Sequence, residues 1–363
     1  MAIKTLGVGV VATVIAALLS VSVMSQTGWD VTVFAAFGVD SHEINEYAGQ
    51  SLDEFYLRPF QGHDGKFFFV QSNDPWVRHP EINASVLDRP LYRSQRMLYP
   101  VLAGGGGLFT PEMIVWALLI VNIVGMGLGS WAAAAVATTL GGSPWWGLSF
   151  VLNIGFISEM NIDGAGIVAA AAAFAAVVAF SRGRTSWGLT VLVLGVLARE
   201  AMLLVAAGIA LWMWIHNRRK DALLSLAVPT MAVAVWGLYL RLQLGWESGV
   251  SQVQEIGLPF VGFIESIPKW LDDPLDLFVA TAVLTLLAVF ARRAIVSREL
   301  VGFAFLGFVV LGIVFTAQVW RSYFDITRAV APIITTFVLL AFARHRSSSN
   351  ETVTAEEGAA GAA

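Results

Sequence analysis

Long apolar stretches that carry almost no ionisable residues constrain the fold of this chain more than any other feature. A membrane-spanning helix needs about 20 mainly apolar residues, because the hydrocarbon core is about 30 Å thick and a helix rises about 1.5 Å per residue. Of the 363 residues, 57% are hydrophobic and 13% are charged, whereas soluble domains are about 25% charged. We therefore expect an all-α, polytopic integral membrane protein in contact with membrane lipids. About ten transmembrane helices are predicted, near residues 6–24, 112–139, 144–158, 164–180, 187–198, 201–215, 222–243, 277–291, 299–318 and 329–343.

Net charge and cysteine content exclude several classes of function. The formal net charge is −4, so no basic face predicts a nucleic-acid partner. The chain has no cysteine, which excludes disulfides, thiol catalysis and cysteine-ligated metals. Its five histidines lack metal-ligand spacing, and no glycine-rich phosphate loop or dinucleotide fingerprint occurs. We predict no metal ligands and no firm cofactor, although acidic residues in the outer loops leave a divalent cation open.

The distribution of lysine and arginine predicts how the chain crosses the membrane. Cytoplasmic loops are enriched in basic residues, so we place the N-terminus inside, both termini in the cytoplasm and the protein in the plasma (inner) membrane as a multi-pass protein. The first apolar run is long for a signal peptide and is predicted to be a retained helix. Residues 1–345 then form one transmembrane domain, and residues 346–363 form a disordered cytoplasmic tail. The predicted inner basic residues are Lys4, Arg182, Arg184, Arg218, Arg219, Lys220, Arg292, Arg293, Arg298, Arg344 and Arg346.

The first outer loop, about 26–108, is the only long polar region between predicted spans. Residues 41–60 have the pattern of an amphipathic helix, with Asp40 as its N-cap. Such a helix lies along a membrane surface. A second helix is predicted to start at Asp64 or Gly65. We therefore expect this loop to contain interfacial helices.

Asp64 is the first candidate for chemistry in this loop. It follows His63 and precedes Gly65, Lys66 and an aromatic run. A carboxylate that is partly shielded from water at a membrane surface is suited to act as a general base. The alternative is that Asp64 only caps the helix that begins at Gly65.

Three arginines follow later in the same loop. On a helix, Arg89, Arg93 and Arg96 would share one face at positions i, i+4 and i+7. Guanidinium groups suit phosphate because they donate two parallel hydrogen bonds and stay charged. A solvated face, or one that contacts lipid headgroups, is the alternative interpretation.

Arg199 and Glu200 interrupt the apolar stretch 187–215, which is too long for one ordinary span. An unpaired charge inside a bilayer costs several kcal/mol, so two short helices that meet at an outer turn fit better than one span. A single long, tilted helix is the alternative. The pair then either braces the turn or lines a wet cavity.

Four more charged residues lie on the predicted outer side. Arg321 and Arg328 flank the last span and are expected to reach the same cavity, with anchoring to lipid headgroups as the alternative. Glu159 and Asp163 lie between the third and fourth predicted spans and also face the outer side. Solvation in a loop explains these two acids as well as a place at the cavity does.

These elements together resemble the GT-C superfamily of membrane glycosyltransferases, and most of all its uncharacterised bacterial members. GT-C enzymes have many spans and an acidic residue in a first outer loop built of interfacial helices. The likeness covers the first loop and the arrangement of spans. The matching elements are Asp64-Gly65-Lys66-Phe67-Phe68, Asp74-Pro75, Tyr92-Arg93-Ser94-Gln95-Arg96-Met97-Leu98-Tyr99-Pro100 and Arg199-Glu200.

The resemblance implies a cell-envelope transferase. Its donor would be a polyprenyl-phosphate-linked sugar, its acceptor a cell-surface glycan or a lipid on the outer face, and the anomeric carbon would be inverted. By the same likeness Asp64 would be the general base, and the arginines would hold the leaving lipid phosphate. The residues implied in substrate binding are His63, Lys66, Arg93, Arg96, Arg199, Glu200, Arg321 and Arg328.

A transporter or flippase for a lipid-linked anionic substrate is the main alternative function. It would use the same arginines, but related halves and polar residues near the middle of the membrane would be expected. The sequence shows no repeat. A structural subunit of a larger assembly is a third hypothesis.

Overall fold

The computed structural model describes residues 2–246 and 256–343. It is 75% helical and contains no strand within the described residues, which confirms the all-α prediction. The predicted disordered tail, residues 346–363, lies outside the described residues.

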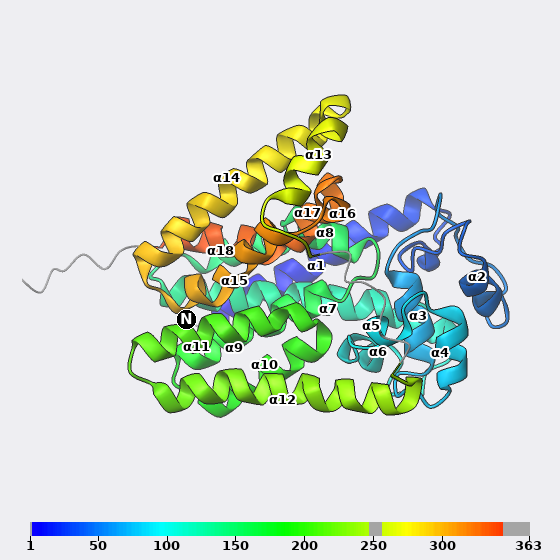
Figure 1. Ribbon diagram of the computed structural model, residues 1–363, viewed down its shortest axis with the longest axis horizontal. Helices are drawn as coiled ribbons and strands as arrows, with labels where there is room; N and C mark the ends of the chain where they lie inside the picture. Colours follow the sequence, from blue (N-terminus) through cyan, green and yellow to red (C-terminus); the bar gives the residue numbers. More distant parts are fainter. Residues whose placement is uncertain (1, 247–255, 344–363) are drawn as a thin grey trace, which may run out of the picture.

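Four helices are long and apolar enough to cross a membrane, and a fifth span would result if one bent pair is counted as a unit. Two of the four, α7 and α12, run along the length of the molecule, and α14 leans away from the others at one end (Figure 1). The bent pair is α17 (Tyr323–Ala329) and α18 (Ala331–Ala341), with 61° between them. The four long helices are α1 (Ala2–Gln26), α7 (Pro111–Thr139), α12 (Arg219–Leu244) and α14 (Pro274–Ser297).

The structure therefore has four to five candidate spans in its described part, not ten. The other long apolar stretches form helices of 13 to 16 residues. At about 1.5 Å per residue these helices extend at most about 24 Å, less than a hydrocarbon core of about 30 Å. The predicted bounds 164–180, 187–198 and 201–215 lie close to the observed ones, whereas α15 ends at Val314 instead of residue 318; the prediction counted these helices as spans although they are short. They are α9 (Gly166–Ser181), α10 (Thr185–Ala198), α11 (Leu203–Ile215) and α15 (Leu300–Val314).

The span predicted at 144–158 is not a continuous helix. It divides into the 3-10 helix η2 (Pro144–Ser149) and the short helix α8 (Ile154–Met160). The Asn153 side chain accepts a hydrogen bond from the Gly155 N–H and so begins a new helix at that point. The prediction failed here because polar caps inside an apolar stretch hardly change its mean hydropathy.

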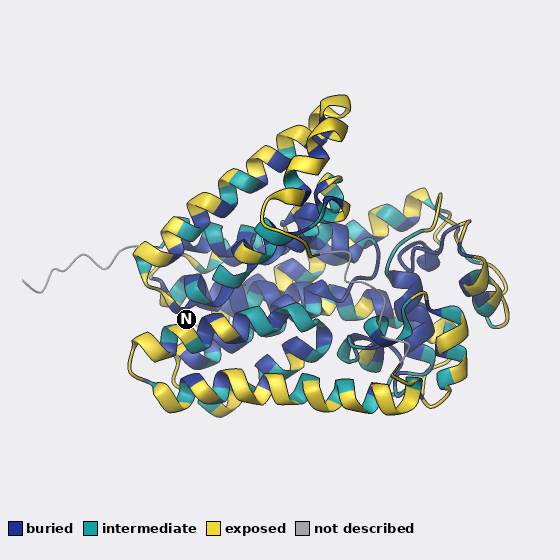
Figure 2. Cartoon of the chain, viewed as in Figure 1, coloured by how far each residue is buried: buried dark blue, intermediate teal, exposed yellow. Residues whose placement is uncertain are grey.

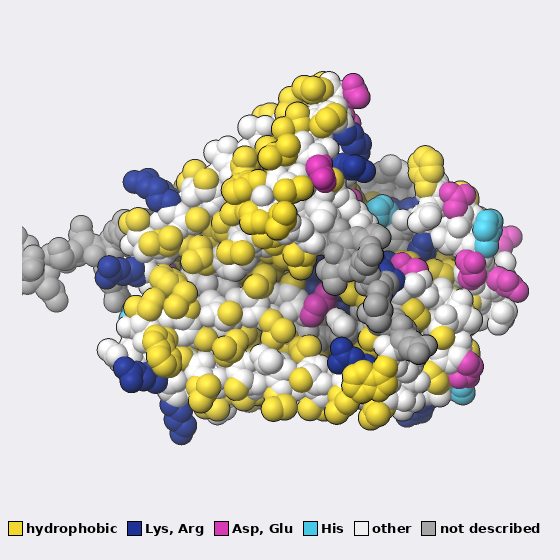
Figure 3. Space-filling model, viewed as in Figure 1, with side chains coloured by type: hydrophobic (Ala, Val, Ile, Leu, Met, Phe, Trp, Pro, Cys, Tyr) yellow, Lys and Arg dark blue, Asp and Glu magenta, His cyan; other side chains and the backbone are white. Residues whose placement is uncertain are grey.

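Helix α7 forms the centre of the molecule. Of its most apolar window 61% is buried, against 17–28% for the other three long helices. Small residues permit this packing: a Cβ on Gly127 would lie 2.0 Å from Thr13 Oγ1, and one on Gly129 would lie 2.3 Å from the Phe150 ring. Figure 2 shows exposed residues along α12 and α14, and Figure 3 shows hydrophobic side chains over the same helices. Such outward apolar faces are suited to contact with lipid.

The predicted first outer loop, about 26–108, folds into short helices, not into one long amphipathic helix. Helix α2 ends at Gly49, and its N-cap is Ser41 instead of Asp40. The following segment turns back: the Tyr56 N–H donates to Thr32 Oγ1, and the Arg58 N–H donates to the Phe37 carbonyl oxygen. These tertiary bonds replace the helical ones that the apolar spacing predicted up to residue 60. The elements of the loop are η1 (Val31–Val33), α2 (His42–Gly49), α3 (Gly65–Asn73), α4 (Pro80–Val86), α5 (Pro90–Arg93) and α6 (Leu98–Ala103).

Two other predicted boundaries are confirmed. Helix α3 starts at Gly65, directly after Asp64. Helix α10 ends at Ala198, Arg199 is extended, and the 3-10 turn η3 (Glu200–Met202) leads into α11. The stretch 187–215 is therefore two helices joined at the Arg199–Glu200 turn. The remaining described helices are α13 (Val261–Asp272) and α16 (Ala317–Trp320).

Gly155 fixes the distance between α8 and α17 and so offers a test of this packing. A Cβ on Gly155 would lie 2.2 Å from the Thr327 carbonyl oxygen and 2.7 Å from the Ala331 Cβ. We expect Gly155→Ala to lower the free energy of unfolding by about 1–3 kcal/mol, because overpacking forces the backbone to move. Thermal unfolding of the purified protein in detergent measures the effect.

Gly237→Ala is the matched control, since no atom beyond the surrounding backbone of α12 and the two chain neighbours lies within 4 Å of a Cβ at Gly237. Alanine is the better helix former, so this variant is expected to be as stable as the unaltered protein or slightly more stable. Equal melting temperatures for the two variants would contradict the close packing of α8 against α17.

Candidate functional site

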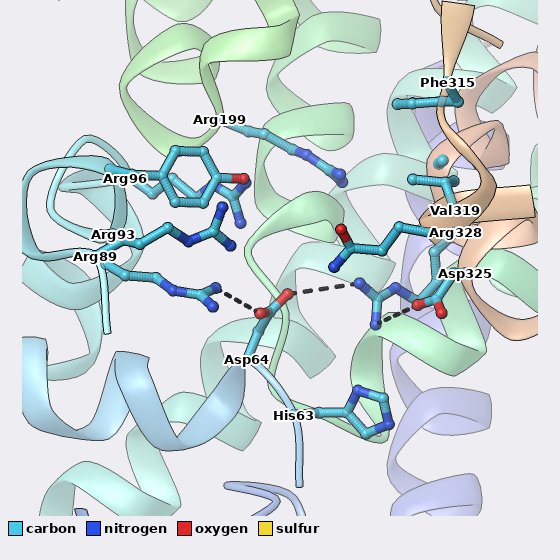
Figure 4. A pocket seen from close by; sticks show the side chains of 13 residues that line it. His63, Asp64, Arg89, Arg93, Arg96, Arg199, Phe315, Val319, Asp325 and Arg328 are labelled. Carbon is cyan, nitrogen blue, oxygen red and sulfur yellow. Dashed lines mark hydrogen bonds and ion pairs between the residues drawn. The ribbon is translucent and has the colours of Figure 1, made fainter. Parts of the chain in front are cut away.

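A cavity of about 250 Å³ lies where the first outer loop meets the Arg199–Glu200 turn and the segment around α16 and α17. Figure 4 shows charged side chains pointing into it from both sides. Residues far apart in the sequence thus converge on one space. The charged residues that line it are Arg89, Arg93, Arg96, Arg199, Arg328, Asp64 and Asp325.

Asp64 lies between two of these arginines. Its Oδ1 accepts a hydrogen bond of 2.8 Å from Arg93 Nη1, and its Oδ2 accepts one of 3.5 Å from Arg328 Nη2. Asp64 occupies the N-cap position of α3 but makes no capping hydrogen bond with its side chain. The interpretation of Asp64 as a mere helix cap is therefore wrong. The next residue must be glycine for the backbone to pack here, since a Cβ on Gly65 would lie 2.6 Å from the Ile162 carbonyl oxygen.

The surrounding charges decide the protonation state of Asp64. Burial alone would raise its pKa, but the guanidinium charges of Arg93, Arg328 and Arg96 outweigh burial and hold the pKa well below its usual range. Asp64 is therefore ionised at neutral pH, with each oxygen paired to an arginine. In this state it is a weak proton acceptor, because proton affinity falls with pKa.

Arg93 is fixed by a carboxylate and an aromatic ring as well as by Asp64. Its Nε and Nη2 donate to the two Asp88 oxygens at 2.9 and 3.0 Å, which is the bidentate arrangement. Its guanidinium carbon lies 3.8 Å from the centre of the Phe67 ring. The first phenylalanine of the aromatic run thus supports the arginine that binds Asp64.

The prediction that Arg89, Arg93 and Arg96 share one helix face is wrong, because α5 contains only four residues. Arg89 precedes α5 and Arg96 follows it, yet both line the cavity with Arg93. The Tyr92 ring lies between them, 4.6 Å from the Arg89 guanidinium carbon and 5.1 Å from that of Arg96. The arginines therefore come together because the chain turns around the Tyr92 ring, and not because they recur at helical spacing.

Two carboxylates outside the cavity lining hold further arginines. Glu200 lies 3.3 Å from Arg96 Nη2, which joins the α10–α11 turn to the first outer loop. Glu159 Oε1 lies 3.3 Å from Arg199 Nη1 and 3.5 Å from Arg328 Nε. Glu159 is only 4% exposed, so of the two interpretations left open for it, solvation in a loop is excluded.

The other predicted site residues lie in different surroundings. The His63 ring lines the cavity, 5.1 Å from the Phe324 ring; burial, followed by the charge of Arg328, lowers its pKa. Lys66 is buried and does not line the cavity: its Nζ donates to Ser41 Oγ and to the Gln61 carbonyl oxygen. Arg321 is exposed and does not line the cavity either.

Sequence reasoning thus found most of the charged cavity lining but missed some of its partners. Asp88 and Asp325 escaped notice because isolated acids in loops are usually solvated. Asp325 lies 3.7 Å from Arg328 Nη1, on the same face of α17 at spacing i, i+3. The position of Asp325 three residues before Arg328 is the feature of the sequence that could have indicated this ion pair.

The site is suited to an anion. Five arginines line it against two carboxylates, Asp64 and Asp325. Among the described residues no group of three or more His, Asp or Glu side chains is placed to hold a metal ion. Two buried nitrogens of Arg328, Nε and Nη1, have ion-pair contacts but no hydrogen bond in the described part of the chain. These contacts orient Arg328, and the five guanidinium groups of the lining suit a ligand with several oxygen acceptors.

Comparison with known proteins gives no match to a family model, to a curated protein or to a solved structure.

Asp163, four residues after Glu159, is a fully buried acid that lies outside the cavity. Burial raises its pKa well above the usual range, and the nearby Asn122 amide and Arg58 charge offset only part of that effect. The folded protein therefore keeps a proton on Asp163 where the unfolded chain loses it, so stability falls as pH rises above about 4.

The neutral amide of Asp163→Asn does not titrate. We expect this variant to gain melting temperature at about pH 8, and the gain to shrink toward about pH 5.

Thermal unfolding in detergent at the two pH values measures this difference. A shift of the same size at both values would show that Asp163 is ionised in the folded protein and would contradict the assignment.

Proposed function

We propose that this protein is a membrane glycosyltransferase of the GT-C type. It transfers a sugar from a polyprenyl-phosphate-linked donor to a glycan or lipid acceptor at the outer membrane surface, with inversion of the anomeric carbon. The observation that carries the proposal is the placement of one carboxylate, Asp64, between Arg93 and Arg328 in an arginine-lined cavity. A carboxylate beside an anion site is what transfer from a phosphate leaving group requires.

The arginines would bind the lipid phosphate. When the bond between the anomeric carbon and the phosphate oxygen breaks, the electron pair stays on that oxygen. Guanidinium groups that already point into the cavity stabilise this charge without having to reorganise. Arg93, Arg199 and Arg328 come from three separate elements and line the same space, so they would contact the phosphate from different sides.

Asp64 would accept the proton of the acceptor hydroxyl while the hydroxyl oxygen attacks the anomeric carbon. The pairing with Arg93 and Arg328 weakens it as a base when the cavity is empty. A bound phosphate competes for the same two guanidinium groups. As it draws them away, the pKa of Asp64 rises and its oxygens become available. Donor binding would therefore precede activation of the base.

The basic residues of the chain support an outer location for the cavity. Arg182, Arg218 and Arg298 lie at the turns after α9, α11 and α14. Lys and Arg side chains gather at one end of the molecule in Figure 3, and the acidic first-loop surface lies at the other end. By the positive-inside rule the basic end faces the cytoplasm. The short apolar helices would lie in the membrane with the long ones, which gives a multi-pass protein with both termini inside.

A transporter of a lipid-linked anion would use the same arginines. Its polar site would be expected near the middle of the membrane, at the junction of two related halves. The charged cavity here is formed in large part by the first outer loop, and this location favours the transferase.

Asp64→Asn tests the proposal directly. We expect transfer to fall by more than about 100-fold, because loss of a general base typically costs a factor of this order. The fold should persist, since Arg93 keeps Asp88 and Arg328 keeps Glu159 and Asp325. The assay is incubation of membranes containing the protein with a panel of radiolabelled polyprenyl-phosphate sugars, followed by extraction of the labelled product.

Asp53→Asn is the matched control: Asp53 is an exposed acid in the same loop and does not line the cavity. It should transfer the label at the rate of the unaltered protein. Full transfer by Asp64→Asn would remove Asp64 from the mechanism.

A further inference from the structure

We propose that Glu159 is the positioning residue of the anion site, because it holds Arg199 and Arg328 together at the wall of the cavity. The inference rests on the proposed function in one respect: it takes the ligand to be the phosphate of a lipid. It goes further because it assigns a role to a buried acid that neither touches the substrate nor lines the cavity.

Glu159 connects two elements that lie far apart in the sequence. It belongs to α8, whereas Arg199 lies at the α10–α11 turn and Arg328 lies in α17. One oxygen, Oε1, contacts both guanidinium groups, at 3.3 Å from Arg199 Nη1 and 3.5 Å from Arg328 Nε. Without a shared counter-charge, two guanidinium groups that both lie within 3.5 Å of one oxygen atom would repel each other.

Two glycines, Gly164 and Gly166, leave space for the Glu159 carboxylate. A Cβ on Gly164 would lie 1.8 Å from Glu159 Oε2. A Cβ on Gly166 would lie 2.9 Å from Glu159 Cδ and 2.9 Å from Arg199 Nη1. Oε2 also accepts a hydrogen bond of 3.4 Å from the Gly166 N–H, at the start of the 16-residue helix α9. The helix N-terminus adds a favourable field for the negative charge.

Arg328 has three carboxylate partners with different roles. Nη2 contacts Asp64, Nη1 contacts Asp325 and Nε contacts Glu159. A phosphate that enters the cavity would displace Asp64 from Arg328, whereas Glu159 lies behind the lining and keeps its contact. Arg199 and Arg328 would therefore stay in position during ligand exchange, which lowers the cost of ordering them on binding.

The test measures binding to the full-length protein in detergent, with farnesyl phosphate as the probe and isothermal titration calorimetry as the readout. We expect Glu159→Gln to weaken binding by about tenfold or more, the size of loss seen when the outer partner of a metal-binding side chain is removed. The matched control is Asp163→Asn, which also replaces a buried acid by its amide but touches no cavity arginine. It should bind the probe as the unaltered protein does.

A double-mutant cycle separates positioning from general stability. If Glu159 acts through Arg199 and Arg328, Glu159→Gln should cost less binding in an Arg199→Gln background than alone. A merely structural role predicts additive losses. Glu159→Asp is the second variant: its shorter side chain should reach only one arginine and give an intermediate loss, which keeps the test decisive if Glu159→Gln does not fold.

The controls distinguish the sources of failure. Farnesol lacks the phosphate and inorganic phosphate lacks the chain, so a Glu159-dependent loss is expected for inorganic phosphate and not for farnesol. No binding of farnesyl phosphate by the unaltered protein would contradict the proposed function. Equal or tighter binding by Glu159→Gln would overturn the role of Glu159 alone.

Discussion

The structure depends on the pairing of carboxylates with arginines at one end of an apolar helix assembly. The arginine side chains are largely shielded from water, and Glu159 is buried. Removing one partner of a shielded pair leaves the charge of the other uncompensated. Here each cavity arginine has an acidic partner: Asp88 for Arg89 and Arg93, Glu200 for Arg96, and Glu159 for Arg199 and Arg328. These pairs also join the first outer loop to the helices around it, so the charges that form the site hold its walls together.

The elements around the site are short, and the breaks between them bring side chains from distant parts of the sequence to a common space. The apolar stretch 187–215 breaks at Arg199, and α17 meets α18 at 61°. Gly65 and Gly155 let the neighbouring backbone approach closely, and Gly166 leaves room for the Glu159 and Arg199 side chains. Long helices such as α7 and α12 supply the apolar frame, and the breaks and turns between shorter helices supply the polar groups.

The sequence was sufficient for the fold class and for much of the site, but not for the spans. Hydropathy predicts apolar surface, and it located α1, α7, α12 and α14 well. It did not separate a continuous helix from two short ones, because a cap such as Asn153 changes local hydrogen bonding and not mean hydropathy. The arginines were found because charge is rare in apolar sequence. Glu159 was named among the charged residues of the outer side, but its burial was not predicted because it depends on tertiary contacts with Arg199 and Arg328. Lys66 was misplaced because its partner Ser41 lies 25 residues earlier.

The central claim is that the arginine-lined cavity around Asp64 binds the phosphate of a lipid. The most direct measurement is an electron cryomicroscopy structure of the full-length protein with farnesyl phosphate bound. The account predicts the phosphate within about 4 Å of the Arg93, Arg199 and Arg328 guanidinium groups, as charge-assisted contacts require, with Asp64 released from at least one arginine. A phosphate bound instead in a different cavity, which Arg292 and Arg293 of α14 line, with the Asp64 pairs unchanged, would contradict it.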